Sequence, residues 1–467
     1  MISARRATVA FLVVFVVSRL GVAWSGLGFS TEHVASIMHF PDLELLRDRW
    51  LETVWFLHGQ PPGPSLVLGG LQQIAGASWP TALALLSHGL VGGLGLAMLT
   101  VCCRLGVRPG AALAAALGFL ALPSVLVYEH YAFTTLPLAA LLLFACVPLC
   151  RVATGGPSAL QAFLLLAASV LWVRNVFHLV WWLACLLLAW RVSPARRRTV
   201  LLAALLPALV AVAPYAKNAF VHGRFEASSW LGFGLARKTY HQEPLAVRQA
   251  EALRGERPAI EGVPVFGSVE EYALAVPLPA ATGVPLLDAP RKRNGEVNYH
   301  HAIVATASAQ MARSALAHLA RQPERYLQNV ATTAAQFFAP AAAWPPVATP
   351  RASLGRYGRF LDGLLHTPWF GPCNLWFLFT LAALGSTLPA VWRVVGQRRR
   401  ADAADVVATF CSGTFVYLAL VAVCLDTGEV MRHRLKVDGL LWLAAALRWL
   451  PKHAASPIPS LPLASTP

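Results

Sequence analysis

Apolar segments long enough to approach a membrane span recur along most of this chain, and two longer polar stretches interrupt them. A helix that crosses a bilayer needs about 20 predominantly apolar residues. Because three of the ten candidate segments are short, we expect about nine to eleven spans. The segments are 7–27, 81–101, 110–128, 135–150, 158–173, 175–191, 199–216, 373–393, 405–425 and 437–450. The pattern predicts an all-α fold, a polytopic bundle of membrane helices.

The first polar stretch, 28–80, contains two further helical patterns. Residues 42–57 place apolar side chains at helical spacing: Leu43, Leu46, Trp50, Val54 and Leu57. Asp42 follows Pro41 and is placed to cap this helix, while Trp50 and Trp55 would anchor its apolar face at the membrane surface. Residues 64–77 are apolar but rich in glycine. We predict that they form a re-entrant or interfacial helix packed on the bundle.

Arginine and lysine gather in the short loops between the spans, and this distribution predicts the orientation of the chain. Cationic short loops mark the cytoplasmic side of a membrane protein. Here they lie around Arg5, Arg104, Arg151, Arg196–Arg198 and Arg398–Arg400. Both polar stretches, 28–80 and 217–372, then face outward. We expect an N-terminal membrane module (1–216), an outer cap (217–372), C-terminal membrane helices (373–453) and a disordered tail (454–467).

Composition agrees with the membrane class and excludes several others. Only 13% of the residues are charged and 57% are hydrophobic, whereas soluble domains are about 25% charged. The net charge of +16 would suggest nucleic acid in a soluble protein, but no basic face interleaved with aromatic residues appears. The eight cysteines lie in or beside apolar runs, so neither a disulfide framework nor a cysteine-based zinc site is expected in the cap. A cleaved signal peptide at 1–27 is an alternative that would still leave Asp42 outside.

Carboxylates at the outer rim are candidates for acid–base chemistry. Asp42 and Glu44 begin the helix of the first outer loop. They are either a helix cap and a surface carboxylate, or they supply a general base that takes a proton from an acceptor hydroxyl. Glu129, after the third span, is either an interface anchor or a second carboxylate beside the same substrate.

Cations on the outer side depart from the preference of arginine and lysine for cytoplasmic loops, and they suggest an anionic partner. Arg174 either marks a turn or binds a phosphate, and Lys217 either snorkels or binds a lipid phosphate. Arg432 and Arg434 alternate along the sequence, so in an extended chain they would share a face and clamp an anion.

Several segments together give a family resemblance. They are Asp42-Leu43-Glu44-Leu45-Leu46, Trp55 through Pro62, Tyr128 through Phe133, Arg174 through His178, Lys217-Asn218 with Ser228-Ser229-Trp230, Gly295 through His300, Pro323 through Tyr326, and Gly428-Glu429 with Arg432 and Arg434. Over nearly its whole length the chain resembles the GT-C superfamily of polytopic glycosyltransferases, in the bacterial protein-mannosyltransferase-like and arabinose-transferase-like branch. It departs from that pattern where Leu43 separates Asp42 from Glu44.

The resemblance implies transfer of a sugar from a polyprenyl-phosphate donor to an acceptor hydroxyl on a lipid, glycan or protein, with inversion. It places the chain in a bacterial inner or plasma membrane with an extracytoplasmic active site. Asp42 would be the general base, supported by Glu44 and Glu129. The donor phosphate would meet Arg174, Lys217, Arg432 and Arg434, while His58, Gln60 and Glu429 would position the substrate or the loop. The sequence predicts no metal site, although Mg²⁺ or Mn²⁺ could bridge carboxylate and phosphate.

Two other classes remain open from the sequence, a membrane transporter or lipid flippase and a non-catalytic GT-C-like protein. Transporters tend to show two related halves with broken helices meeting at the membrane midplane, and no such repeat is visible. An enzyme should bring Asp42, Glu129 and the cations to one outer cavity open to lipid.

Overall fold

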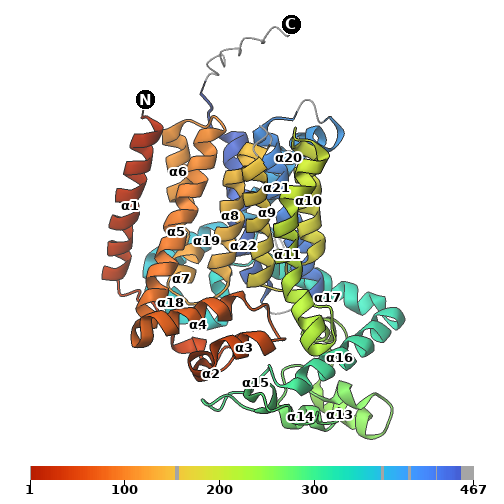
Figure 1. Cartoon of the computed structure of the whole chain (residues 1–467). Coiled ribbons are helices and arrows are strands. Elements are labelled where there is room, and N and C mark those ends of the chain that lie inside the picture. Colours follow the sequence, from red (N-terminus) through yellow and green to blue (C-terminus); the bar gives the residue numbers. More distant parts are fainter. Residues whose placement is uncertain (1, 153–156, 370–372, 398–400, 427–428, 454–467) are drawn as a thin grey trace.

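The computed structural model describes residues 2–152, 157–369, 373–397, 401–426 and 429–453. Within these ranges the chain forms α-helices and short 3₁₀ helices, with isolated β-bridges and no strand. The predicted all-α helical bundle is confirmed (Figure 1). Gly428 of the sequence pattern, the Arg398–Arg400 cluster and the tail predicted to be disordered lie outside the described residues.

Upright apolar helices form the body of the molecule. They are α1 (Ala4–Trp24), α5 (Trp79–Arg104), α6 (Pro109–Leu120), α8 (Thr135–Val152), α9 (Pro157–Val173), α10 (Leu179–Val192), α11 (Arg197–His222), α20 (Leu375–Gly396), α21 (Ala403–Leu425) and α22 (Val430–Trp449). Polar caps fix several of their starts. Ser3 and Asn374 each accept a hydrogen bond from a first-turn N–H, and Asp402 forms a reciprocal capping box with Asp405.

Fewer helices pass as full membrane spans than the nine to eleven expected. Six stretches of the described chain are long and apolar enough: α1, α8, α11, α20, α21 and the 42-residue stretch Gly63–Arg104 that contains α5. A seventh is obtained if α6 and α7 (Pro123–Glu129) count as one bent span. The chain is thus a multi-pass membrane protein by length and composition. The apolar helices α9 and α10 are shorter, and α22 begins with a charged segment.

Two predicted helices are broken in the structure. The segment 110–128 was expected to be one span, but α6 and α7 meet at an angle of 64°. Pro123 starts α7 and has no N–H with which to continue the helix of α6. The segment 42–57 divides into α2 (Leu43–Asp48) and α3 (Trp50–Phe56) at Arg49, whose φ of −137° and ψ of 48° leave the helical region. This break allows the Trp50 ring to pack against Gly69.

The first polar stretch lies across the lower end of the bundle (Figure 1). It contains α2, α3, α4 (Gly63–Ala75) and the 3₁₀ helices η1 (Glu32–Val34) and η2 (Gly76–Ser78). The predicted apolar helix at 64–77 is therefore α4, with Leu66, Val67 and Ile74 exposed. Asp42 caps α2 as predicted, its carboxylate accepting a hydrogen bond from the backbone N–H of Glu44.

The second polar stretch covers the same end. It contains α12 (Leu231–Lys238), α13 (Leu245–Leu253), α14 (Val269–Ala273), α15 (Pro285–Asp288), α16 (Ala302–Arg321), α17 (Pro323–Phe337), α18 (Ala348–Ser353), α19 (Gly355–His366) and the 3₁₀ helices η3 (Tyr240–Gln242), η4 (Ala259–Gly262), η5 (Ala341–Ala343) and η6 (Pro345–Val347). Its first part has its own apolar cluster, including Phe233, Tyr272 and Met311. After α17 the chain rejoins the main core, where Phe337 and Trp344 are buried. Both polar stretches lie opposite the end where α1 begins and α22 ends (Figure 1).

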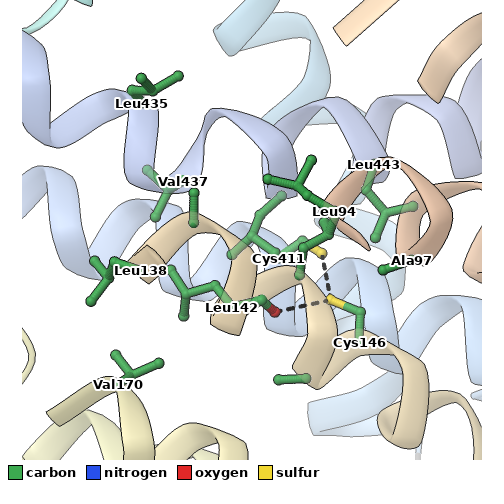
Figure 2. Close-up of a cluster of buried hydrophobic side chains, with 14 of the residues drawn as sticks. Leu94, Ala97, Leu138, Leu142, Cys146, Val170, Cys411, Leu435, Val437 and Leu443 are labelled. Atoms are coloured by element: carbon green, nitrogen blue, oxygen red, sulfur yellow. Dashed lines mark hydrogen bonds between the residues drawn. The ribbon is translucent and has the colours of Figure 1, made fainter. Parts of the chain in front are cut away.

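The bundle core consists of small and branched apolar side chains from several helices. Figure 2 shows Leu94 of α5, Leu142 and Cys146 of α8, Cys411 of α21 and Leu443 of α22 meeting in one cluster. The sulfur atoms of Cys146 and Cys411 lie 3.9 Å apart. All eight cysteines are free, and most are buried, so they act as small apolar side chains, as the sequence predicted.

The close approach of α3 to α4 makes a testable prediction about two adjacent glycines. A Cβ on Gly69 would lie 2.1 Å from Cδ1 of Trp50, whereas a Cβ on Gly70 would lie 3.4 Å from its Cζ2. Gly69→Ala should lower the free energy of unfolding by about 1–3 kcal/mol through overpacking. Gly70→Ala should change it by no more than about 1 kcal/mol, since alanine favours the helix. Thermal unfolding in detergent would measure both, and equal losses would contradict this packing.

Candidate functional site

A cavity of about 860 Å³ lies where the cap meets the lower end of the bundle. We call it the arginine cavity. Its polar lining includes His39, Gln60, Arg174, Asp426, Glu429 and His433, and its apolar lining includes Tyr215, Phe225, Trp344, Val421 and Leu425. Of the residues predicted for the site, it brings together Gln60, Arg174 and Glu429.

Arg174 is buried in the turn between α9 and α10. Its Nη1 donates a long hydrogen bond of 3.4 Å to Oε1 of Gln60, and its Nε has no partner among the described residues. Burial, aided by the neighbouring Arg432 guanidinium, lowers the pKa of Arg174 to about 9, so the group keeps its charge at neutral pH. Buried polar groups are normally hydrogen-bonded, so a buried cation with an unused donor is suited to bind an anion.

Arg432 lies beside Arg174 and is fully buried in the first turn of α22. Its guanidinium carbon is 4.4 Å from the ring centres of both Phe133 and Trp344. It forms an ion pair with Glu429, while its Nε and Nη1 have no partner among the described residues. Cation–π contacts stabilise the charge where water is excluded. Two neighbouring buried guanidinium groups therefore have donors without a partner among the described residues: Arg174, which lines the arginine cavity, and Arg432, which lies behind it.

Asp426, which follows α21, is held by a chain of buried groups on α22. Nε2 of His433 donates to Oδ2 of Asp426 at 2.5 Å, and Nδ1 of His433 accepts from the ammonium of Lys436. Burial opposes ionisation of Asp426, but the hydrogen bond from His433 and the charges of Arg237 and Arg432 outweigh it and lower its pKa. Asp426 is thus a carboxylate in the wall of the arginine cavity.

Asp42 and Glu44 line a different cavity, of about 470 Å³, which we call the Asp42 cavity. Both carboxylate oxygens of Asp42 accept backbone hydrogen bonds, Oδ1 from Glu44 at 2.8 Å and Oδ2 from Arg293 at 2.6 Å. The Arg293 side chain forms an ion pair with Glu44. The Lys292 ammonium bonds the carbonyl oxygens of Ala35 and Ile37 at 3.0 and 2.9 Å. The turn around residues 292–294 therefore covers Asp42.

Glu129 lines neither of these two cavities. It is fully buried at the end of α7, where it accepts hydrogen bonds from Nε of Arg19 at 3.0 and 3.1 Å and contacts Nδ1 of His88 at 2.8 Å. It ties α1, α5 and α7 together. Among the described residues, these two cavities thus separate Asp42 and Glu129 from Arg174, because the first loop folds Asp42 against Arg293 and α1 supplies a partner for Glu129.

Lys217, predicted to bind the donor phosphate, and His58, predicted to position the substrate or the loop, hold the first loop in place. The ammonium of Lys217, on α11, donates to the carbonyl oxygen of Leu57. His58 is buried, with Nδ1 2.7 Å from Oγ of Ser229 and Nε2 2.9 Å from the carbonyl oxygen of His300. Burial and the nearby His222 lower the pKa of His58 to about 3, so it is neutral at physiological pH. These contacts join the first loop to the cap.

Arg434 does not share a face with Arg432, so the extended clamp expected from their alternation is wrong. Residues 430–436 begin α22 instead of forming a loop, and positions two apart on a helix point in nearly opposite directions. Arg434 bonds Asp438 at 3.3 Å and the carbonyl oxygen of Phe337 at 3.3 Å, and its guanidinium lies over the Trp376 ring. It has partners in the bundle core and none in the arginine cavity.

Sequence reasoning missed Asp426, Lys436 and His39 as parts of the site. A helical interpretation of 430–436 would have placed His433 and Lys436 on one face, one turn apart.

Among the described residues, no group of three His, Cys, Asp or Glu side chains is arranged to hold a metal ion. No protein-family model, curated protein or solved structure matches this chain.

The Glu129 ion pair makes a prediction about stability. Glu129→Gln would leave Arg19 nearly buried beside a neutral amide, so it should cost about 3–5 kcal/mol of unfolding free energy. Glu44→Gln, which removes a half-exposed pair with Arg293, should cost no more than about 1 kcal/mol. Thermal unfolding of both variants in detergent would compare them. A loss for Glu129→Gln as small as that for Glu44→Gln would rule out a structural role.

Proposed function

We propose that this protein is a membrane glycosyltransferase that moves a sugar from a polyprenyl-phosphate donor to an acceptor hydroxyl on the extracytoplasmic side. The observation that carries the proposal is a pair of neighbouring buried guanidinium groups whose donors lack partners among the described residues, Arg174 in the lining of the arginine cavity and Arg432 beside it. Such groups are suited to bind a phosphate that leaves as an anion. Fixed hydrogen-bond donors can stabilise the negative charge on the leaving phosphate, so the phosphate does not need to be protonated.

The lining of the arginine cavity supports a lipid-linked donor in particular. Tyr215 of α11 and Val421 and Leu425 of α21 line it together with the cations. Both helices belong to candidate membrane spans. A ligand with an anionic head and an apolar tail would place its phosphate at Arg174 and its tail along these side chains.

In the proposed reaction Asp42 takes the proton of the acceptor hydroxyl. The acceptor oxygen attacks the anomeric carbon, the bond from that carbon to the phosphate oxygen breaks, and polyprenyl phosphate leaves with the electron pair. Residues 35–42 contribute to the walls of both cavities, since Ala35 and Asp42 line one and His39 lines the other. The turn at Lys292–Arg293 donates hydrogen bonds to this segment. The turn must therefore move aside for Asp42 to reach an acceptor.

Substitution of the two arginines tests donor binding. Arg174→Gln or Arg432→Gln should weaken binding of a polyprenyl-phosphate sugar by at least about 30-fold, because losing one partner of a buried charge pair costs 2–5 kcal/mol or more. Arg174→Lys should retain part of the affinity, and Arg356→Gln, which removes an exposed arginine of α19, should retain all of it. Binding would be measured on protein in lipid nanodiscs with a radiolabelled donor. Equal affinity in all four variants would refute the phosphate site.

Asp42→Asn tests the chemistry. Asparagine also caps helices, so α2 should persist, while sugar transfer should fall by about 10²–10⁴-fold through loss of the base and donor binding should stay unchanged. The measurement is release of labelled sugar from polyprenyl-phosphate mannose, glucose and arabinose by wild type and variant in nanodiscs. Full turnover in Asp42→Asn would disprove the base assignment. Donor binding without turnover in the wild type would favour a transporter or a non-catalytic protein.

A further inference from the structure

Two carboxylates lie in the wall of the arginine cavity, and a bound phosphate does not account for them. Asp426 and Glu429 both line this cavity close to Arg174 and Arg432. A carboxylate next to a phosphate repels it. Glu429 forms an ion pair with Arg432 and so offsets a buried charge. Asp426 is held by the imidazole of His433.

The support behind Asp426 is a series of buried hydrogen bonds. His433 and Lys436 are both fully buried on α22, one turn apart. With Lys436 donating to Nδ1 of His433, the remaining ring proton lies on Nε2 and points at Oδ2 of Asp426. This arrangement fixes the carboxylate at the cavity wall, where its side chain retains 26% of its exposure. An ionised carboxylate offers only acceptors, so its matching ligand group is a donor such as a hydroxyl.

Aromatic side chains also line the arginine cavity. Trp344, Trp230 and Phe225 line the same cavity, and flat apolar rings pack well against the C–H faces of a sugar. The volume of about 860 Å³ lies within the range of about 300–1,000 Å³ found for small-molecule sites. The cavity thus combines cations for a phosphate, a carboxylate for hydroxyl groups and aromatic walls.

We propose that Asp426, oriented by His433 and Lys436, binds hydroxyl groups of the donor sugar and helps to select which sugar is accepted. This inference rests on the proposed function, because it assigns the sugar of the same donor whose phosphate meets Arg174 and Arg432. Hydrogen bonds to an ionised carboxylate are about twice as strong as neutral ones. Asp426 therefore contributes to recognition of the sugar and not to recognition of the lipid phosphate.

The test compares two probes on the same protein in nanodiscs. One is polyprenyl phosphate without a sugar, and the other is polyprenyl phosphate carrying mannose, glucose or arabinose. Asp426→Asn should weaken binding of the preferred sugar-bearing probe by about 10-fold or more, the size expected for a hydrogen bond to a charged group. Its affinity for the sugar-free probe should stay the same or rise, because a negative charge near the phosphate is removed. Glu324→Gln, which alters an exposed carboxylate of α17, should change neither affinity.

Other outcomes separate this inference from the proposed function. Equal losses for both probes would make Asp426 a structural partner of His433 and overturn the inference, as would no change for either probe. A wild type that binds no polyprenyl phosphate would overturn the proposed function and the inference with it. If Asp426→Asn does not fold in a thermal-shift assay, Asp426→Glu takes its place. That variant keeps the charge but moves it, so it should alter the order of preference among the three sugars while binding the sugar-free probe like the wild type, and an unaltered order would overturn the inference.

Discussion

The need to pair charges inside a low-dielectric bundle governs the structure around α22. Arg432, His433, Arg434, Lys436 and Asp438 are at most 1% exposed, and an unpaired buried ion costs several kcal/mol. These polar groups therefore need partners from neighbouring elements. Arg434 contacts Asp438, the end of α17 and Trp376 of α20, while the hydrogen bonds from Lys436 to His433 and from His433 to Asp426 link α22 to the end of α21.

The same constraint makes the arginine cavity the candidate site. Most buried polar groups in a folded protein are hydrogen-bonded, and Arg434 and Glu129 both have local partners. Arg174 and Arg432 do not, since each keeps guanidinium nitrogens without a partner among the described residues. Arg174 lines the cavity where the cap meets the bundle, and Arg432 lies beside it. A ligand with an anionic head is the simplest chemical group that would complete them.

The separation of the two cavities has a mechanistic consequence. Arg174 lines one cavity and the carboxylates of the first loop line the other, and residues 35–42 contribute to the walls of both. That segment is held by hydrogen bonds from Lys292 and Arg293. In the proposed reaction, movement of this cap turn would change access to Asp42 while Arg174 keeps its place. The proposed donor and acceptor sites would then be linked through this short segment.

Much of the helical layout could be predicted from the sequence, because apolar run length and proline or capping residues act locally. The capping role of Asp42 and the positions of α5, α8 and α21 follow from such signals. The break between α6 and α7 and the break at Arg49 were not anticipated. The first has a local cause, Pro123, which the long apolar run masked, whereas the second depends on how Trp50 packs against Gly69. The start of α22 was also misplaced, since its charges resemble a loop until their buried partners are known.

For the site, the sequence by itself determined which chemical groups are present at the outer ends of the helices: carboxylates, arginines and a histidine-rich first loop. Only the tertiary structure decided their grouping. Glu129 forms an ion pair with Arg19 and Arg434 with Asp438, and Asp42 accepts a hydrogen bond from Arg293. Arg174 and Arg432 lie near each other and near Asp426. The physical reason is that a charge is satisfied by its nearest partner in space, and the distances between residues far apart in sequence are fixed only when the helices pack.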